Sequence, residues 1–149
     1  MEFESKWLTP SDCDFRGLAS ELSLKLKNIT GDSGQNSFSV DDFDPDKDGC
    51  IVVYVNKIAV ACGVFRFYAP NTCEFKRMYS KCAGAGGFLL SQLEVEAFNR
   101  GYTKVLLSTR RVNNQAVRFY LRNSFKEIEP FGRYVGVEKS ICLGKQLFT

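Results

Sequence analysis

The sequence predicts a mixed α/β domain in which helices cover the faces of one sheet. Segments rich in Val, Ile, Phe and Tyr recur along the chain and are bounded by turn residues, as strands are. Between them lie segments whose apolar residues recur every three or four positions, as in helices with one buried face. Near the middle, a strand-like segment, a glycine cluster and a helical segment follow one another directly. This order of strands and helices favours a mixed sheet with helices packed on it.

The size and composition are those of one soluble domain, spanning residues 1–149. Hydrophobic residues make up 44% of the chain and charged residues 25%, as is usual for globular proteins. The apolar runs are too short for a membrane helix and no secretory signal opens the chain, so we expect a cytoplasmic protein that does not contact membranes. The net charge of +3 comes from scattered basic residues and does not predict nucleic-acid binding.

Histidine is absent and the six cysteines have no Cys-x-x-Cys spacing. We therefore expect buried free thiols and no metal site. Mechanisms that require an imidazole base are excluded, which removes most serine and cysteine hydrolases.

The chain is expected to begin with a strand over residues 3–8 and a turn that ends in helix-capping residues. A helix is then predicted by apolar residues at helical spacing, namely Phe15, Leu18, Leu22 and Leu26. Residues 28–36 are polar and contain two glycines, which indicates a loop. This loop is either a plain connector or part of a substrate pocket.

Residues 50–55 and 57–68 are predicted to form an antiparallel hairpin. Both segments are rich in β-branched and aromatic residues, and Asn56-Lys57 provides a tight connection between them. A second turn, over residues 69–72, leads into the next strand.

An acidic segment precedes this hairpin. Asp44, Asp46, Asp48 and Gly49 match the first half of an EF-hand calcium loop. The position that should hold a bidentate glutamate is Val55, and the flanking segments indicate a loop and a strand where an EF-hand has two helices. We expect an acidic turn that leads into a strand, with a calcium-binding module at Asp44–Asp48 as the alternative.

The stretch from Cys73 to Gly101 carries the main functional signal. Its first part, up to residue 80, mixes aromatic and long side chains as a strand does, and residues 84–87 are almost all glycine. Four apolar residues then predict a helix that stops near Gly101, namely Leu89, Leu90, Leu93 and Ala97. Glycines allow a ligand to approach the backbone, and the first helical turn offers unpaired N–H groups at the positive end of its dipole. This arrangement predicts a phosphate-binding site.

The last third of the chain is expected to complete the sheet. Residues 104–109 form a short apolar strand, which should run parallel to the strand before the glycines because a helix separates the two. Capping residues and apolar spacing predict a helix around residues 113–121. Residues 125–131 and 140–147 are interpreted as two closing strands.

These motifs resemble those of the GNAT N-acetyltransferase superfamily over nearly the whole chain, most specifically over residues 57–147. The run Lys81-Cys82-Ala83-Gly84-Ala85-Gly86 matches the glycine motif Arg/Gln-x-x-Gly-x-Gly/Ala, and Leu89-Leu90 follows as the double leucine. The strand that leads into this motif is similar to Glu74–Tyr79. The sequence departs from the family at Lys81, which replaces Arg or Gln, and in a shorter loop before the glycines.

A later family motif is also present. Asn113-x-x-Ala116, then Phe119-Tyr120 and Asn123-Ser124-Phe125, resemble the pattern of Asn-x-x-Ala and Tyr before a Gly-Phe ending. Ser124 stands where the family usually has glycine. These motifs, in the right order and spacing, identify the fold as GNAT-like.

The resemblance implies a mixed, mostly antiparallel sheet of six to seven strands flanked by helices. It also implies transfer of the acetyl group of acetyl-CoA to a primary amine by direct attack in a ternary complex. The positions that match the family's acetyl-CoA site are Met78, Tyr79, Ser80, Lys81, Ala83, Gly84, Ala85, Gly86, Gly87, Asn113, Ala116 and Tyr120. Arg122 is a further candidate for contact with a CoA phosphate, or else a residue of a solvated helix face. The main chain at Met78–Ser80 would pair with the pantetheine arm, and the amides of residues 84–87 would hold the pyrophosphate.

Catalytic roles are expected for two residues. Tyr120 is the candidate proton donor to the leaving thiolate, since a phenol with a pKa near ~10 can donate to it; the alternative is a core aromatic residue with a hydrogen-bonded hydroxyl. Because there is no histidine, Glu74 is the candidate carboxylate base, or else an ion-paired residue of the sheet. In the closing loop, Tyr134 and Glu138 are candidate substrate-binding residues.

A second class of function stays open, namely a non-catalytic acyl-CoA-binding regulator on the same fold, which the shorter loop favours. A Rossmann dinucleotide site is excluded, because Leu89 occupies the place of the third glycine. The sequence does not define the amine acceptor, and a homodimer is an expectation from the family alone.

Overall fold

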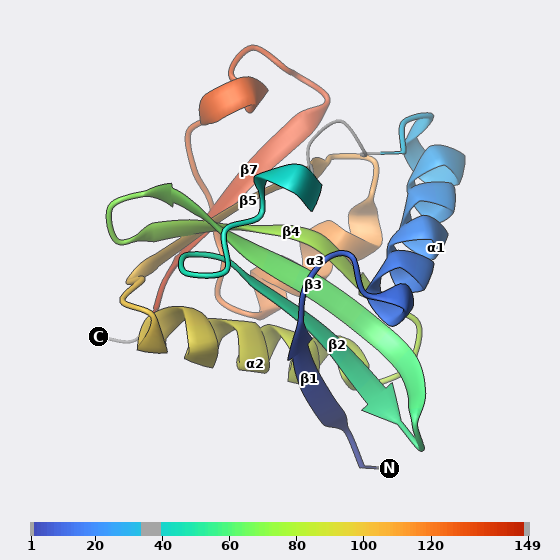
Figure 1. Ribbon diagram of the computed structural model, residues 1–149. Coiled ribbons are helices and arrows are strands. Elements are labelled where there is room, and N and C mark those ends of the chain that lie inside the picture. The colour runs from blue at the N-terminus through green and yellow to red at the C-terminus, as the bar shows by residue number, and fades with distance from the viewer. Residues whose placement is uncertain (1, 34–39, 148–149) are drawn as a thin grey trace.

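The computed structural model describes residues 2–33 and 40–147, which form one mixed sheet with helices on both faces (Figure 1). The elements follow the predicted order. They are β1 (Glu4–Leu8), α1 (Cys13–Thr30), the 3-10 helix η2 (Val40–Asp42), β2 (Gly49–Val55), β3 (Ile58–Ala69), β4 (Thr72–Ser80), α2 (Ala85–Asn99), β5 (Lys104–Arg110), α3 (Asn114–Arg122), β6 (Lys126–Glu127), the 3-10 helix η3 (Gly132–Tyr134) and β7 (Ser140–Gln146).

In the described residues, the sheet has seven strands in the order β1-β2-β3-β4-β5-β7-β6. All neighbouring strands are antiparallel except β4 and β5, which are parallel. The fold class predicted from the sequence, a mixed and mostly antiparallel sheet of six to seven strands flanked by helices, is therefore confirmed. None of the described helices has the length and apolar character needed to cross a membrane.

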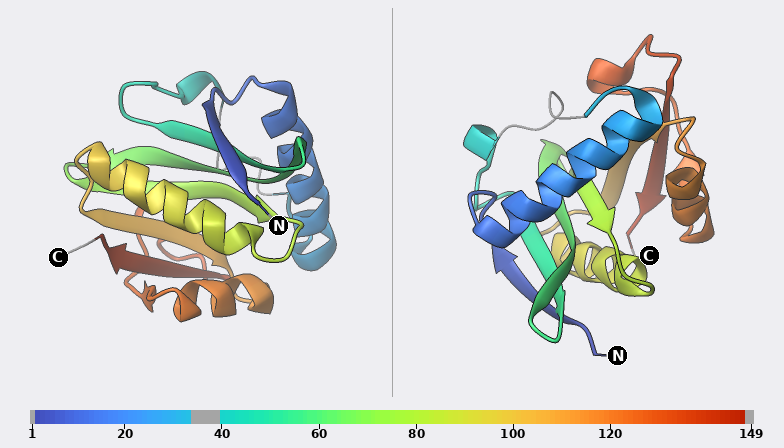
Figure 2. Two further views of the ribbon diagram at one scale, coloured as in Figure 1. Left: turned by 90° about the horizontal axis from the view of Figure 1, so that it is seen from below. Right: turned by 90° about the vertical axis from the view of Figure 1, so that its right-hand side faces the viewer.

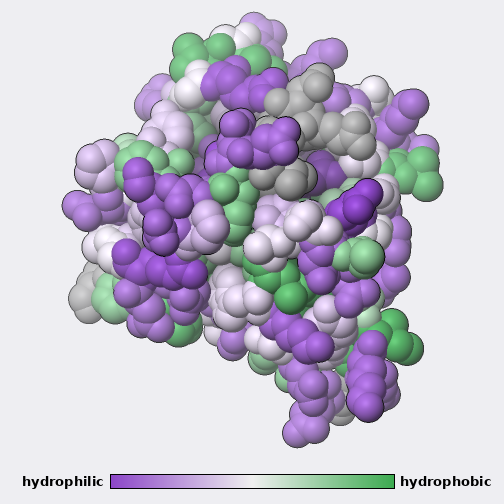
Figure 3. All heavy atoms as spheres, viewed as in Figure 1, coloured by the Kyte–Doolittle hydropathy of each residue, from purple (hydrophilic) through white to green (hydrophobic). Residues whose placement is uncertain are grey.

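Two cores lie on opposite faces of this sheet. Side chains alternate between the faces of a strand, and β2 shows the alternation clearly. Ile51 and Val53 belong to a cluster that includes the buried leucines of α2, whereas Cys50 and Val52 belong to one with Phe15 of α1. Helices α1 and α2 thus cover opposite faces, as Figure 2 shows, and strand β2 is buried on both sides. On the face shown in Figure 3, apolar residues form only small groups among polar ones.

Local signals in the sequence explain the first elements. The side chain of Asp12 accepts hydrogen bonds from the amides of Asp14 and Phe15 and caps α1, and Gly31 ends this helix with a φ of 82°. Helix α1 therefore extends to Thr30, and the loop predicted from residue 28 was placed too early. Residues 34–36 of that predicted loop lie outside the described residues.

The hairpin of β2 and β3 is confirmed. Both turn residues have positive φ, 51° for Asn56 and 67° for Lys57, which is the conformation of a tight two-residue hairpin turn.

The predicted strand over residues 125–131 was too long, because β6 contains only Lys126–Glu127. The amide of Ile128 still donates to the carbonyl of Cys142 at 2.9 Å, but Pro130 has no N–H to continue the ladder. The chain then leaves the sheet and forms η3.

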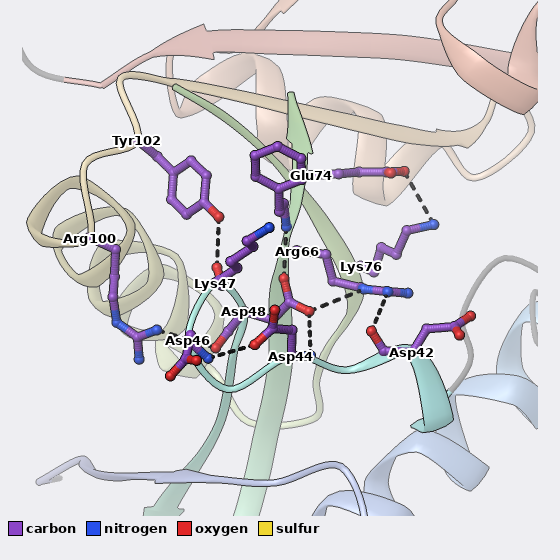
Figure 4. A network of polar contacts seen from close by, with 11 residues as sticks. Asp42, Asp44, Asp46, Lys47, Asp48, Arg66, Glu74, Lys76, Arg100 and Tyr102 are labelled. Carbon is purple, nitrogen blue, oxygen red and sulfur yellow. Dashed lines mark hydrogen bonds and ion pairs between the residues drawn. The ribbon is translucent and has the colours of Figure 1, made fainter. Parts of the chain in front are cut away.

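The acidic segment before β2 has a structural role, shown in Figure 4. The carboxylate of Asp48 is 3% exposed and accepts hydrogen bonds from the amides of Asp44 and Phe67, both at 2.8 Å. It also lies 3.6 Å from Nε of Arg66. Since Asp44 in turn accepts from the amide of Asp46, these carboxylates cap their own turn. Within the described residues, no cluster of three or more potential metal ligands is found, so the calcium alternative has no support.

Candidate functional site

A bulge bends strand β4 in its middle. The pairing register shifts between Cys62 and Val64 of β3, so that both Arg77 and Met78 lie opposite Gly63. Arg77 takes the left-handed conformation, with a φ of 54°. A Cβ atom on Gly63 would lie 2.6 Å from Sδ of Met78 and 2.9 Å from Cδ1 of Leu93, so a larger residue there would force these two side chains to move. The sequence interpretation gave β4 as a regular strand and missed this bulge.

Beyond the bulge, β4 pairs with no strand of the described residues on its β5 side. The parallel ladder pairs only three residues of each strand and ends at Glu74 and Leu106, although β4 continues to Ser80. The strands separate at this point, and two clefts lie along the separation. We call them the glycine cleft and the arginine cleft.

The glycine cleft has a volume of about 620 Å³. It lies between the β4 edge, the N-terminus of α2, and one side each of α1 and α3. Its lining residues are Leu22, Lys25, Leu26, Met78, Tyr79, Ser80, Lys81, Cys82, Ala83, Gly84, Gly86, Gly87, Leu89, Asn113, Gln115, Ala116, Phe119, Tyr120 and Arg122. The structure thus gathers here every residue that the resemblance suggested for acetyl-CoA binding, except Ala85.

Ala85 is fully buried beneath the cleft, and its amide donates to the carbonyl of Cys82 at 3.0 Å. Neither its side chain nor its N–H is therefore available to a ligand. Asn113 lines the cleft but also acts as the N-cap of α3, where its side chain accepts from the amide of Ala116 at 3.4 Å.

The N-terminus of α2 opens onto this cleft. Its N-cap is Gly84, with a φ of 84° and no side-chain cap. The amides of Gly84, Gly86 and Gly87 have no acceptor within the part of the chain that the structure describes. All three glycines line the cleft, and a Cβ atom built on Gly87 meets nothing within 4 Å. Unpaired amides at the positive end of a helix dipole favour an anion.

Basic side chains add to this preference, since Lys25, Lys81 and Arg122 line the same cleft. Lys81 pairs with Glu21 of α1 at 3.2 Å, and the other oxygen of Glu21 accepts from the Tyr79 hydroxyl at 3.2 Å. The sequence interpretation assigned no residue of α1 to this cleft. Lys25 and Glu21 stand one helical turn apart, beside the apolar stripe, and that spacing was the available signal.

Tyr120 joins the core to the glycine cleft. Its ring is 7% exposed and makes edge contacts with the rings of Phe119 at 5.3 Å and Phe125 at 5.4 Å. Its hydroxyl has no hydrogen-bond partner among the described residues, unlike the bonded hydroxyl of a purely structural tyrosine. Burial raises the pKa of Tyr120 above the usual value for a phenol, so the hydroxyl keeps its proton at neutral pH.

The arginine cleft is smaller, with a volume of about 230 Å³, and shares Leu26 with the glycine cleft. Its lining residues are Leu26, Thr30, Asp32, Arg77, Ser108, Thr109, Arg110, Arg133, Tyr134, Val137 and Ser140.

Glu74 and Tyr134, both candidates from the sequence, are in contact at this second cleft. The Tyr134 hydroxyl donates to the Glu74 carboxylate at 3.3 Å, and the same carboxylate oxygen lies 3.3 Å from Nζ of Lys76. Glu74 is 8% exposed and lines neither cleft, so it reaches a ligand only through Tyr134. Burial and the Glu74 charge raise the pKa of Tyr134, so this phenol also stays protonated.

Glu138, the other candidate in the closing loop, is exposed and lines neither cleft. Its backbone carbonyl, rather than its side chain, is engaged, accepting from Arg111 at 3.2 Å. The geometry of the two clefts therefore gives no support to a substrate-binding role for Glu138, which stays a prediction.

Comparisons with known proteins agree with this geometry. Residues 19–125 match the family model described as the acetyltransferase (GNAT) family. The chain belongs to the GNAT family. The match spans the glycine cleft, including the N-terminus of α2 and all of α3. No curated protein matches the chain significantly.

Solved structures share the GNAT fold over almost the whole chain. A Klebsiella pneumoniae protein assigned as an acyl-CoA N-acyltransferase superimposes with a TM-score of 0.84 at 22% identity, covering 98% of each chain. The PaiA N-acetyltransferase of Thermoplasma acidophilum, in complex with coenzyme A, gives 0.73 at 17% identity, covering 98% of this chain and 99% of that one. The ribosomal-protein-S18-alanine N-acetyltransferase of Escherichia coli gives 0.68 at 15% identity, covering 98% and 96%. At these identities the likeness concerns the fold.

Proposed function

We propose that this GNAT protein is an N-acetyltransferase that transfers the acetyl group of acetyl-CoA to a primary amine by direct attack in a ternary complex. The observation that carries the proposal is the glycine cleft, in which three unpaired helix amides and the free Tyr120 hydroxyl face the same open space. The coenzyme A seen with the PaiA neighbour supports the choice of co-substrate.

The cleft residues fit the parts of this co-substrate. The amides of Gly84, Gly86 and Gly87 bind the pyrophosphate, and the nearby lysines balance its charge. The edge of β4 over Met78–Ser80 has backbone groups for the extended amide chain of pantetheine, as in the addition of a strand to a sheet. A backbone N–H near Met78 and Tyr79 stabilises the negative charge that develops on the thioester oxygen.

Tyr120 supplies the proton that the reaction needs at sulfur. The amine nitrogen forms a bond to the thioester carbon, the carbon–sulfur bond breaks, and the departing thiolate takes the proton of the Tyr120 hydroxyl. The Tyr120 phenolate then regains a proton as the acylated nitrogen loses its extra one, which leaves a neutral amide and a free CoA thiol. The raised pKa of Tyr120 favours this role, because the hydroxyl stays protonated until sulfur becomes basic.

The amine must also lose a proton before it attacks, since an ammonium group has no lone pair. We assign this step to Glu74 acting through Tyr134. The Tyr134 hydroxyl takes a proton from the amine side while it passes its own proton to the carboxylate 3.3 Å away. In this assignment Glu74 is a base that acts through a relay.

Binding of coenzyme A, measured by calorimetry on a Gly87→Leu variant, tests the proposal. The new side chain has open space around it, so the fold should persist while the anion site is filled. We expect affinity for coenzyme A to fall at least about 100-fold, as for the loss of a pyrophosphate site. Gly17→Leu is the matched control, because Gly17 also lies in a helix with nothing within 4 Å but lines neither cleft. Equal affinity of both variants would remove the glycine cleft as the coenzyme A site.

A non-catalytic acyl-CoA-binding regulator would bind coenzyme A in the same cleft. It would differ in showing no release of free CoA thiol with any amine, so the two functions separate in a turnover assay on the unmodified protein. The cytoplasmic location also stays a proposal. It is supported by free cysteines at all six positions, as expected in a reducing compartment.

A further inference from the structure

The arginine cleft has a positive wall. Three arginines line it, Arg77, Arg110 and Arg133, with one acidic residue, Asp32, which gives the described lining residues a net charge of +2. The volume of about 230 Å³ is less than half of the 620 Å³ of the glycine cleft. A ligand that fits this cleft is small and carries an anionic group.

The guanidinium of Arg77 forms no ion pair with any carboxylate of the described residues. It donates to the carbonyl oxygens of Ala19 at 2.7 Å and Ser33 at 3.3 Å and to the hydroxyl of Ser23, all neutral acceptors. Within residues 2–33 and 40–147, no acidic side chain lies within ion-pair distance of it. Burial lowers the pKa of Arg77, in keeping with a cation partly withdrawn from water. A bound anion would supply the counter-charge that the fold does not.

The other arginines differ in their surroundings. Arg110 pairs with Asp32 at 2.9 Å, so this pair contributes little net charge. Arg133 comes from η3, the short helix that also carries Tyr134, and its positive charge acts on both Tyr134 and Lys76. Apart from the Arg110–Asp32 pair, the charged residues that line the cleft are Arg77 and Arg133.

We propose that the acceptor is an amine that also carries a carboxylate, as a free amino acid does. The inference rests on the proposed acetyltransferase function and names its acceptor class. The carboxylate lies against Arg77 and Arg133, and the amine points towards Leu26, where the two clefts meet. Arginine is suited to this task because its planar N–H groups match a carboxylate. Polyamines and aminoglycosides are disfavoured, because they bring further positive charge against the same wall.

The experiment compares each amino acid with its amide, which lacks the carboxylate charge, and with amines that carry further positive charge. The unmodified protein is assayed with acetyl-CoA by release of free CoA thiol, using the common L-amino acids, the corresponding amino acid amides, spermidine and kanamycin. We expect at least one amino acid to be acetylated, with kcat/KM at least about tenfold above that of its own amide. Spermidine and kanamycin should fall below that amide.

Arg133→Gln tests the residue assignment, since Arg133 is exposed and the change should leave the fold intact. We expect KM for the preferred amino acid to rise at least about tenfold, with little change for its amide, and Arg133→Lys to restore part of the loss. Arg16→Gln is the matched control, because Arg16 is an exposed arginine of α1 that lines neither cleft. Arg77 is unsuitable for this purpose, because its hydrogen bonds also join α1 to β4.

The outcomes separate this inference from the function on which it rests. The proposed acceptor class is wrong if the amides, spermidine or kanamycin react as well as the amino acids. It is also wrong if Arg133→Gln lowers activity equally with amino acids and their amides. In both cases the proposal of an acetyltransferase remains. If coenzyme A binds but no amine of any class reacts, the acetyltransferase proposal itself fails, and the acceptor class fails with it.

Discussion

Replacing Tyr120 by phenylalanine removes one oxygen atom from the boundary between the core and the glycine cleft. The ring, which is 7% exposed, keeps its edge contacts with Phe119 and Phe125. The hydroxyl has no partner among the described residues, so its removal leaves no donor or acceptor unsatisfied. We therefore expect the free energy of unfolding to change by less than about 0.5 kcal/mol.

The effect on turnover should be large by comparison. A positioned proton donor typically contributes about 10²- to 10⁴-fold to a rate, which corresponds to roughly 3–5 kcal/mol in the activation barrier. Because the proton is needed only when the thiolate leaves, affinity for coenzyme A should stay within about twofold. Burial raises the pKa of Tyr120, and the active form of a donor is the protonated one. Loss of kcat through ionisation of Tyr120 should therefore begin only well above pH ~10, the usual phenol value.

The assay is initial-rate release of free CoA thiol with saturating acetyl-CoA, combined with calorimetry of coenzyme A binding and with thermal unfolding. Tyr54→Phe is the control, because the Tyr54 hydroxyl donates to Asp14 at 2.6 Å in the core on the other face of the sheet. That variant should lose about 1 kcal/mol of stability and keep its kcat. If Tyr120→Phe retains kcat within about twofold, Tyr120 is not the donor and the proposed mechanism is wrong at that step.

Three further predictions concern other parts of the structure. Asp48→Asn should lower the free energy of unfolding by about 2 kcal/mol in denaturant. The asparagine side chain has one acceptor oxygen for the amides of Asp44 and Phe67, and no charge to balance the guanidinium of Arg66. An unchanged unfolding midpoint would contradict the structural role of Asp48. Burial raises the pKa of Cys62 from 9.0 to about 12. The protonated thiol therefore contributes fully to the stability of the fold below pH 9. As the pH rises from 9 towards 12, this contribution falls by up to roughly 1.4 kcal/mol per pH unit. Cys62→Ala should make the free energy of unfolding fall less steeply between pH 9 and 12. A free energy of unfolding that does not change with pH over this range in the unmodified protein would refute the prediction. Tyr134→Phe and Glu74→Gln should each lower kcat about 100-fold if the proton relay operates, and the double variant should lose no more than either single one; additive losses would argue for separate roles.

Much of the fold was predictable because its signals are local. Strand β2 alternates between two cores, Asp12 caps α1, and the Asn56-Lys57 turn closes the hairpin, and each is set by a few neighbouring residues. The errors came where a single residue ends an element. Pro130 stops the ladder of β6 after two residues, and this was overlooked in a segment that otherwise has strand-like composition.

The lining of the glycine cleft could be predicted where the family motif covers it, and the roles of these residues stay predictions. The residues from β4, α2 and α3 were assigned from the motif, and the structure places nearly all of them around one cleft. The particular residues that α1 contributes were not assigned, because Glu21 and Lys25 are more than fifty residues away from Tyr79 in the sequence. The contact between Tyr134 and Glu74 is equally remote, and no spacing rule connects residues on a closing loop and a central strand.

The bulge at Arg77 joins the two halves of the site. A non-glycine residue with a φ of 54° costs of order 1–3 kcal/mol, and persists only where its surroundings offset that cost. Here the offset comes from the side chain, whose hydrogen bonds to Ala19 and Ser23 fasten α1 to β4. The backbone of this residue thus turns the β4 edge towards the glycine cleft, while its charge lines the arginine cleft. Since α1 supplies Leu26 to both clefts, a change at Arg77 should disturb co-substrate and acceptor binding together. A change at Arg133 should disturb only the acceptor, and this difference makes Arg133 the informative position for identifying what the enzyme acetylates.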